Sequence, residues 1–206
     1  MPGVLFEGGS FRAIFSCGVM DALLDQDVMF PYCIGVSAGA ADSASYISRQ
    51  KERNLNMLLR YRNDKRYMGL RNYFKKEHSL FGVDFVFRKM PNVLFPFDMD
   101  TFQNYAGDYV VVTTDANTGK PHYFHKEDVD DRFDVICASC ALPVYFQAVH
   151  IGGGVYYDGG VSDPVPIRRL QRDGHHKALI VLTRPEGYRK ACGRSDRFAA
   201  GVLRRR

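Results

Sequence analysis

The chain has 206 residues, 46% of them hydrophobic and 25% charged, with a formal net charge of +5. This composition is ordinary for a soluble globular protein, and the length predicts a single domain with a sizeable core. It argues against a membrane-spanning protein, because no apolar run approaches the roughly 18 residues that a span needs. The first residues lack the basic flank and long apolar stretch of a secretory signal, so we expect the protein in the cytoplasm.

The positive charge is concentrated in two places. Residues 184–206 contain eight Arg and Lys against two acidic residues, a charge of +6, so the rest of the chain is close to neutral. This distribution argues against a nucleic-acid-binding protein, whose domain carries a broad basic surface. The second basic stretch, residues 49–76, is either a solvated helical face or a surface that orients the protein on an anionic membrane.

The five cysteines form an odd set without the spacing of a disulfide framework, so we expect reduced and mostly buried thiols. Residues 137–140 match the C-x-x-C pattern, but neither a second pair nor a nearby histidine completes a zinc site. We therefore expect no metal and no cofactor.

In chain order, the first half predicts two strand–turn–helix units. The apolar run at residues 4–6 ends in a glycine turn, and apolar residues at helical spacing follow over 14–24. The run at 33–36 repeats this pattern, with small residues suited to close helix packing from residue 38 onward. Residues 49–105 are basic and then rich in phenylalanine. We expect a helical insertion over the sheet, with rings that are mostly core and in part line an acyl pocket.

The second half predicts further strands and short helices. We expect strands at 109–113 and 178–182, a hairpin tip at 117–120, and helices at 128–137 and 167–172. Strands that alternate with helices favour a mostly parallel sheet covered on both faces. Active sites of such sheets lie beyond the carboxyl ends of the strands, where both glycine-rich turns of the first half fall.

The motif G-V-S-A-G at residues 35–39 lies between a predicted strand and a predicted helix. A serine there sits on a strained elbow, with its hydroxyl exposed and the N-terminus of the following helix behind it. Gly35 and Gly39 are needed because side chains at these positions would collide with the neighbouring strand and helix. The pattern also occurs in ordinary tight turns, but this context favours Ser37 as a nucleophile.

Two further motifs carry chemistry. Residues 7–12, E-G-G-S-F-R, form a glycine turn at a helix start, and its backbone N–H groups suit a developing oxyanion. A plain tight turn is the alternative, and a phosphate-binding loop is disfavoured because no Gly-Lys-Ser/Thr follows. Asp158, which precedes Gly159 and Gly160, either makes an Asx-turn or supplies a carboxylate to the site.

In this order the motifs resemble the patatin-like phospholipase family, over about residues 4–183. The family's signature of glycines followed by x and Arg/Lys corresponds to residues 8–12, its nucleophile elbow to 35–39, and its Asp-Gly-Gly/Ala motif to 158–160. The segment A-S-C-A-L-P at 138–143 is similar to the family's A-S-x-A-x-P. The chain looks closest to the small bacterial members.

The resemblance implies a three-layer α/β/α sandwich and hydrolysis of acyl lipids without a metal. It implies a dyad of Ser37 and Asp158 beside an oxyanion loop of Gly8, Gly9 and Ser10. The substrate is then an acyl lipid or small ester, and the activity that of a phospholipase A, a lysophospholipase or a carboxylesterase. A free aspartate, with a pKa of about 4, is a weak base, so this dyad requires a desolvated carboxylate in an apolar cleft.

Three residues depart from the family pattern. Glu7 replaces the usual leading Asp, Ser10 the third glycine, and Ala13 the glycine after the Arg. Ser10 still supplies a backbone N–H, so the oxyanion hole forms if a serine tolerates the required backbone angles. Arg12 either braces the loop or contacts a headgroup, and Gly159 is a further supporting residue of the site.

Other functions stay open at this point. His175 and His176 follow Asp158 in the Ser…Asp…His order of α/β-hydrolases, but they lie in a polar turn, so a solvated turn is favoured over a triad. A non-catalytic lipid-binding or membrane-surface protein on a hydrolase scaffold is favoured by Ser10 and Ala13. An acyltransferase is the third alternative.

We predict an acyl hydrolase domain at residues 1–190, with the insertion at about 49–105, and a basic tail at 191–206. The tail is either truncated or altered relative to the family, or it forms a short linking helix. The sequence leaves headgroup, chain length and positional preference open, and does not decide between a monomer and a homodimer.

Overall fold

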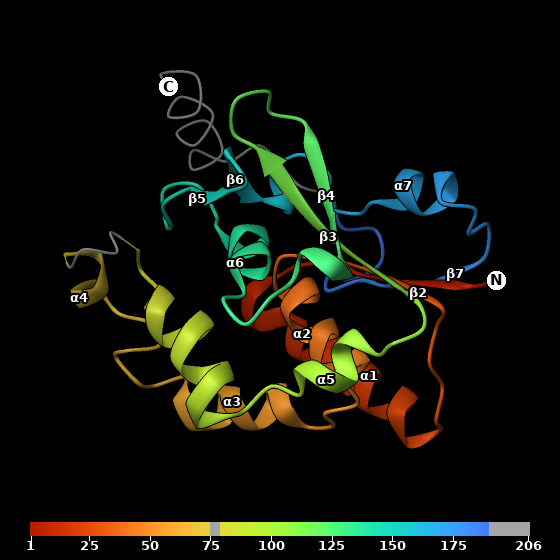
Figure 1. Cartoon of the computed structure of the whole chain (residues 1–206), viewed down its shortest axis with the longest axis horizontal. Helices are drawn as coiled ribbons and strands as arrows, with labels where there is room; N and C mark the ends of the chain where they lie inside the picture. Colours follow the sequence, from red (N-terminus) through yellow and green to blue (C-terminus); the bar gives the residue numbers. More distant parts are fainter. Residues whose placement is uncertain (75–78, 190–206) are drawn as a thin grey trace.

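A seven-stranded sheet forms the centre of the computed structural model, which describes residues 1–74 and 79–189 (Figure 1). The strand order is β5-β6-β3-β2-β1-β7, and β4 pairs with β3. The strands are β1 (Gly3–Phe6), β2 (Tyr32–Val36), β3 (Asp108–Asp115), β4 (Pro121–His125), β5 (Val149–Ile151), β6 (Gly154–Asp158) and β7 (Ala178–Val181). The predicted basic tail at 191–206 lies outside the described residues, as do the last two residues of the basic stretch at 49–76.

The direction of the strands divides the sheet into two parts. Strands β7, β1, β2 and β3 run parallel, while β4 and β6 run antiparallel to β3, and β5 antiparallel to β6. The α/β sandwich around a mostly parallel sheet is therefore confirmed. The antiparallel β5–β6 hairpin was not predicted from the sequence. It turns through Gly152 and Gly153, both at positive φ, so this glycine run before Asp158 has a structural role.

Short helices connect and cover the strands. They are the 3₁₀-helix η1 (Ser10–Ala13), α1 (Ile14–Asp25), α2 (Ala38–Ile47), α3 (Arg53–Tyr61), α4 (Leu70–Tyr73), the π-helix η2 (Phe85–Leu94), α5 (Met99–Gln103), the 3₁₀-helix η3 (Lys126–Asp128), α6 (Asp134–Cys140), the 3₁₀-helix η4 (Gly159–Val161) and α7 (Ile167–Arg172). Within residues 1–74 and 79–189, no helix combines the length and apolar character needed to cross a bilayer.

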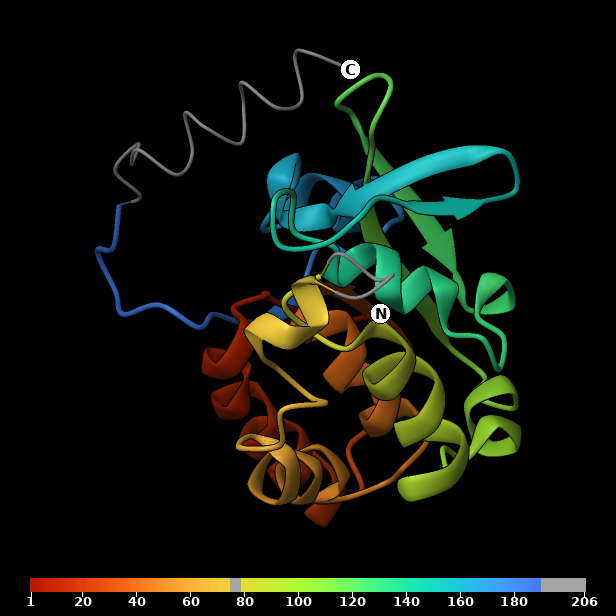
Figure 2. The ribbon, with the colours of Figure 1, turned by 90° about the vertical axis from the view of Figure 1, so that its left-hand side faces the viewer.

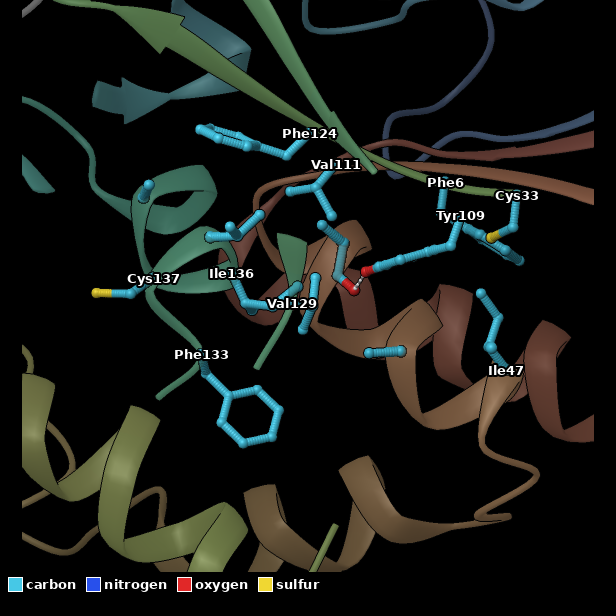
Figure 3. Close-up of a cluster of buried hydrophobic side chains, with 14 of the residues drawn as sticks. Phe6, Cys33, Ile47, Tyr109, Val111, Phe124, Val129, Phe133, Ile136 and Cys137 are labelled. Atoms are coloured by element: carbon cyan, nitrogen blue, oxygen red, sulfur yellow. Dashed lines mark hydrogen bonds between the residues drawn. The ribbon is translucent and has the colours of Figure 1, made fainter. Parts of the chain in front are cut away.

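Alternating residues of the strands build two cores, one on each face of the sheet. On β1, Val4 and Phe6 join the larger cluster, which includes side chains of α1, α2 and α6 (Figure 3). Leu5, between them, faces the other side and packs in a smaller cluster with Leu170 of α7. This period of two is what a strand imposes, and it makes the sheet the middle of three layers.

The segment 49–105 contributes α3, α4, η2 and α5, which lie on the same side of the sheet as α1 and α2 (Figure 2). Fewer of its phenylalanines are fully buried than expected. Phe85, Phe87 and Phe102 are buried, but Phe81 and Phe97 are only half-buried. Both rings line a cavity together with the buried Phe87.

The helix expected at 128–137 begins later and ends later, as α6 at Asp134–Cys140. Phe133 interrupts the predicted helix because its backbone is left-handed, with φ at 54°. This conformation turns its ring toward the insertion (Figure 3). There it meets Phe97 edge-on, with 5.2 Å between the ring centroids. The helix expected at 167–172 is present as α7.

Candidate active site

The pairing of β3 brings together Ser37 and Asp158, which lie 121 residues apart in sequence. The last residue of β2, Val36, pairs with Val112 of β3, and Asp158 at the end of β6 pairs with the next residue, Thr113. Strand β6 therefore continues along β3 from the point where β2 stops. The Ser37 hydroxyl donates a hydrogen bond of 2.7 Å to Oδ2 of Asp158.

Ser37 has the strained backbone expected of a nucleophile elbow. Its φ of 55° and ψ of −128° are unusual for a residue with a side chain, and such a conformation costs of order 1–3 kcal/mol. Ser139 on α6 helps to hold it, because the Ser37 N–H donates to the Ser139 hydroxyl at 2.9 Å. That hydroxyl in turn donates to the carbonyl of Val112 at 2.7 Å. The A-S-x-A-x-P segment pointed to this position, but the sequence assigned Ser139 no role.

The glycines around the elbow stand where backbones approach closely. A Cβ at Gly39 would clash with the carbonyl oxygen of Phe6, and one at Gly35 would lie 2.5 Å from the Cα of Ala40. A Cβ at Gly159 would clash with a backbone carbonyl of β3. These residues therefore let α2 pack tightly against β1 and β2, and they set the start of η4 against β3.

Asp158 is almost completely buried, with 1% of its surface exposed. Its Oδ1 accepts the N–H of Gly160 at 2.7 Å, and its own N–H donates to the carbonyl of Ala141 at 2.9 Å. The hydroxyl of Thr114 donates to its carbonyl at 2.8 Å. Burial raises the pKa of Asp158 to about 6, although the hydrogen bonds from Ser37 and Gly160 act in the opposite direction.

The glycine loop lies directly against the serine. A Cβ at Gly8 would be 2.8 Å from the Cβ of Ser37. Thr183, two residues beyond β7, anchors the loop by donating from its hydroxyl to the carbonyl of Gly8 at 2.7 Å. The carboxylate of Glu7 accepts the N–H of Thr183 at 2.6 Å, and the same carboxylate oxygen lies 3.0 Å from the Thr183 hydroxyl. Glu7, a departure from the family pattern, thus ties the loop to the end of the sheet. No local motif marked Thr183.

Ser10 adopts the backbone that a glycine would adopt there, with φ at 49°. The left-handed region costs a residue with a side chain about 1–2 kcal/mol, so the serine is accommodated at a modest expense. The backbone N–H of Arg12 donates to the carbonyl of Gly9 at 3.1 Å, which closes the turn. The Arg12 side chain itself is exposed.

A cavity of about 190 Å³ adjoins Ser37. Five phenylalanines contribute most of its aromatic wall: Phe81, Phe87, Phe97, Phe133 and Phe146. Three partly exposed apolar side chains also line it: Phe11, Ile14 and Leu142. The serine hydroxyl therefore faces a largely apolar space enclosed between α2, α6 and the insertion.

The two histidines that follow Asp158 lie at the opposite end of the sheet from Ser37. His175 contacts the carbonyl of Met1 through Nδ1 at 2.9 Å and stacks against Tyr32 with 4.3 Å between ring centroids. Tyr32 begins β2, whereas Ser37 follows its end. The Ser…Asp…His triad is therefore not formed, because the strand length separates its members.

The profile of the family described as "Patatin-like phospholipase" matches residues 4–170. The chain belongs to the patatin-like phospholipase family. A relative from Escherichia coli (strain K12), "Uncharacterized protein YjjU", is 29% identical over 186 residues, which cover 87% of this chain and 51% of that protein. The chain thus spans about half the length of the curated relative it matches.

In this patatin-like protein, substitution of Gly39 by Ala should lower the free energy of unfolding by about 3 kcal/mol or more, because the new methyl group meets backbone that cannot move aside. Urea-induced unfolding measures the change. Gly18→Ala is the matched control, since this exposed glycine of α1 has open space around it. The control substitution should raise the free energy of unfolding by up to about 1 kcal/mol, because alanine has the higher helix propensity. Equal midpoints for Gly39→Ala and the unsubstituted protein would contradict the close packing.

The raised pKa of Asp158 predicts a pH-dependent effect on stability. The folded state holds the proton up to about pH 6, whereas the unfolded state releases it near 3.8. The free energy of unfolding therefore falls as the pH rises from about 3.8 to about 6, because ionisation of Asp158 is less favourable in the folded state. Above about pH 6 the whole of this loss is present. Asp158→Asn removes this loss. The free energy of unfolding of the variant minus that of the unsubstituted protein should therefore be larger at pH 8 than at pH 4, by up to about 3 kcal/mol. Denaturant unfolding at both values tests this, and a difference independent of pH would refute it.

Proposed function

We propose that this protein is a serine carboxylic-ester hydrolase acting on acyl lipids, with Ser37 as nucleophile and Asp158 as general base. The observation that carries the proposal is the 2.7 Å hydrogen bond from the serine hydroxyl to a buried carboxylate beside an apolar cavity. Family membership supports lipid acyl hydrolysis in general.

The reaction proceeds in two halves. As Oγ of Ser37 attacks the ester carbonyl, its proton passes to Asp158, and the carbonyl oxygen becomes an oxyanion. Collapse of this intermediate breaks the bond to the leaving alcohol, which takes the proton from Asp158 and leaves an acyl-serine. Water then attacks the acyl-serine, Asp158 accepts its proton, and the carboxylic acid leaves as Ser37 regains a proton.

The glycine loop is proposed to stabilise the oxyanion through backbone N–H groups of Gly8, Gly9 and Ser10. The contact of Gly8 with Ser37 and the anchor at Thr183 support this role, because a fixed donor needs no reorganisation during the reaction. Removing one such donor typically costs about 3–4 kcal/mol of transition-state stabilisation.

A base without a histidine is chemically reasonable here because the carboxylate is desolvated. A pKa of about 6 leaves Asp158 ionised at neutral pH, yet far better able to accept a proton than an exposed aspartate. The same apolar surroundings that raise its proton affinity also accommodate an acyl chain.

We also propose peripheral contact with an anionic membrane. Phe11, Ile14 and Leu142 are exposed in part and line the cavity, and Phe15 nearby is 61% exposed. Arg12, in the same turn, adds an exposed positive charge. Apolar side chains flanked by a cation suit a headgroup layer, from which an acyl chain can enter the cavity.

A fluorophosphonate probe should label the protein, and Ser37→Ala should abolish labelling, because only the serine activated by Asp158 attacks the phosphorus. The double variant His175→Ala/His176→Ala is the control and should label as the unsubstituted protein does, since His175 contacts the far end of the sheet. Mass spectrometry of the labelled protein gives the site. An unlabelled but folded protein would favour the non-catalytic lipid binder.

The pH dependence of kcat/KM for p-nitrophenyl esters should report Asp158. Activity should rise about ten-fold per pH unit below about pH 6 and level off above it, because only the ionised carboxylate accepts the proton. Asp158→Asn should lower kcat by about 10²–10⁴-fold and remove the inflection. An inflection near pH 6 that survives in this variant would assign it to another group.

A further inference from the structure

The cavity beside Ser37 is not apolar throughout. Asp42 and Arg53 line it together with Asn54, and the Arg53 guanidinium lies over the ring of Phe97, 5.3 Å from its centroid. Asp42 lies on α2, five residues after Ser37, and Ala38 and Ala41 line the same stretch of the helix. With a rise of about 1.5 Å per residue, Asp42 stands roughly 7.5 Å along the helix from the serine.

The guanidinium of Arg53 is held in place by the protein. Two of the Arg53 nitrogens are used: Nη1 donates to the hydroxyl of Ser45 at 3.2 Å, and Nη2 to the carbonyl of Phe95 at 2.7 Å. The thiol of Cys17, on α1, and the Arg53 charge both favour the ionised form of the Asp42 carboxylate and so act to lower its pKa. Burial raises the pKa of Asp42 to about 7, against the influence of this thiol and of the nearby Arg53 charge.

One donor of this group stays unused. The Nε–H of Arg53 is buried and has no hydrogen-bond partner among the described residues. An unpaired buried donor is costly, and so are charges in the wall of a pocket that receives only hydrocarbon. An apolar residue at either position would bind a plain alkyl chain better. The proposed reaction at Ser37 uses neither side chain.

We propose that Asp42 and Arg53 bind a hydroxyl of the substrate, so that the site prefers esters carrying a hydroxyl about six carbons from the reacting carbonyl. An extended chain advances roughly 1.3 Å per carbon–carbon bond, so about six bonds cover the distance along α2. A hydroxyl fits this pair because it donates to the carboxylate and accepts from the guanidinium at once. A carboxylate on the substrate would be repelled by ionised Asp42. The inference rests on the proposed function.

The hydroxyl can belong to either half of the ester. One source is a hydroxylated acyl chain, and the other is a polyol leaving group such as glycerol. Two substrate pairs distinguish them. The acyl pair is p-nitrophenyl 6-hydroxyhexanoate and p-nitrophenyl heptanoate, in which a hydroxyl replaces a terminal methyl. The alcohol pair is monoheptanoyl glycerol and propyl heptanoate.

The ratio of kcat/KM within each pair is the measurement. The unsubstituted protein should prefer the hydroxylated member of one pair by about ten-fold, as expected for hydrogen bonds to charged groups. Asp42→Leu, which has a similar shape without the charge, should abolish or reverse that preference, and Arg53→Met should reduce it. A ratio is insensitive to partial unfolding, which lowers both rates alike.

Controls keep the outcomes distinct. Asp25→Leu removes an exposed carboxylate of α1 that pairs with Lys51, and should leave both ratios unchanged. Asp42→Asn is the second variant should Asp42→Leu fail to fold, and it should weaken the preference. Ratios near one in both pairs, in a protein that hydrolyses heptanoyl esters, would overturn this inference alone. No turnover and no fluorophosphonate labelling would overturn the proposed function, and the inference with it.

Discussion

The site depends on the double pairing of strand β3. One side of this strand is shared by two partners, since β2 pairs with its first part and β6 continues from Thr113. Ser37 and Asp158 each stand at the end of their own strand, and the common neighbour sets the separation between them. A slip of β6 by one residue against β3 would turn the Asp158 carboxylate to the opposite face of the sheet. The hydrogen bond between the two side chains is thus a consequence of backbone register.

Burial sets the proton affinity of the two carboxyl groups beside the cavity. Asp158 and Asp42 are both carboxyl groups with raised pKa values, and desolvation is the largest cause for each. Their environments differ in the partners provided. Asp158 has a serine hydroxyl and a backbone N–H, whereas Asp42 has a thiol and a nearby guanidinium. The first arrangement suits proton transfer, and the second suits recognition of a neutral polar group.

The motifs around Ser37 and Asp158 could be read from the sequence because steric demands there are local. A glycine is needed wherever a side chain would meet backbone, so the elbow leaves a pattern of residues in sequence. The anchoring contacts leave a weaker trace, since the A-S-x-A-x-P segment marks the position of Ser139 without its partners and no motif marks Thr183. Ser139 and Thr183 reach the site only through long-range packing, and the late start of α6 follows from the backbone of Phe133. Spacing along the chain carries no information on these contacts.

The bond between Thr183 and the glycine loop connects the turn after β1 to the segment that follows β7. Glu7 and Gly8 are synthesised about 175 residues before Thr183, the residue that holds them. The loop beside Ser37 therefore cannot reach its final position while β7 is still being synthesised, even when the first two strands have already paired. During synthesis, a nascent chain that contains both Ser37 and Asp158 still lacks this anchor.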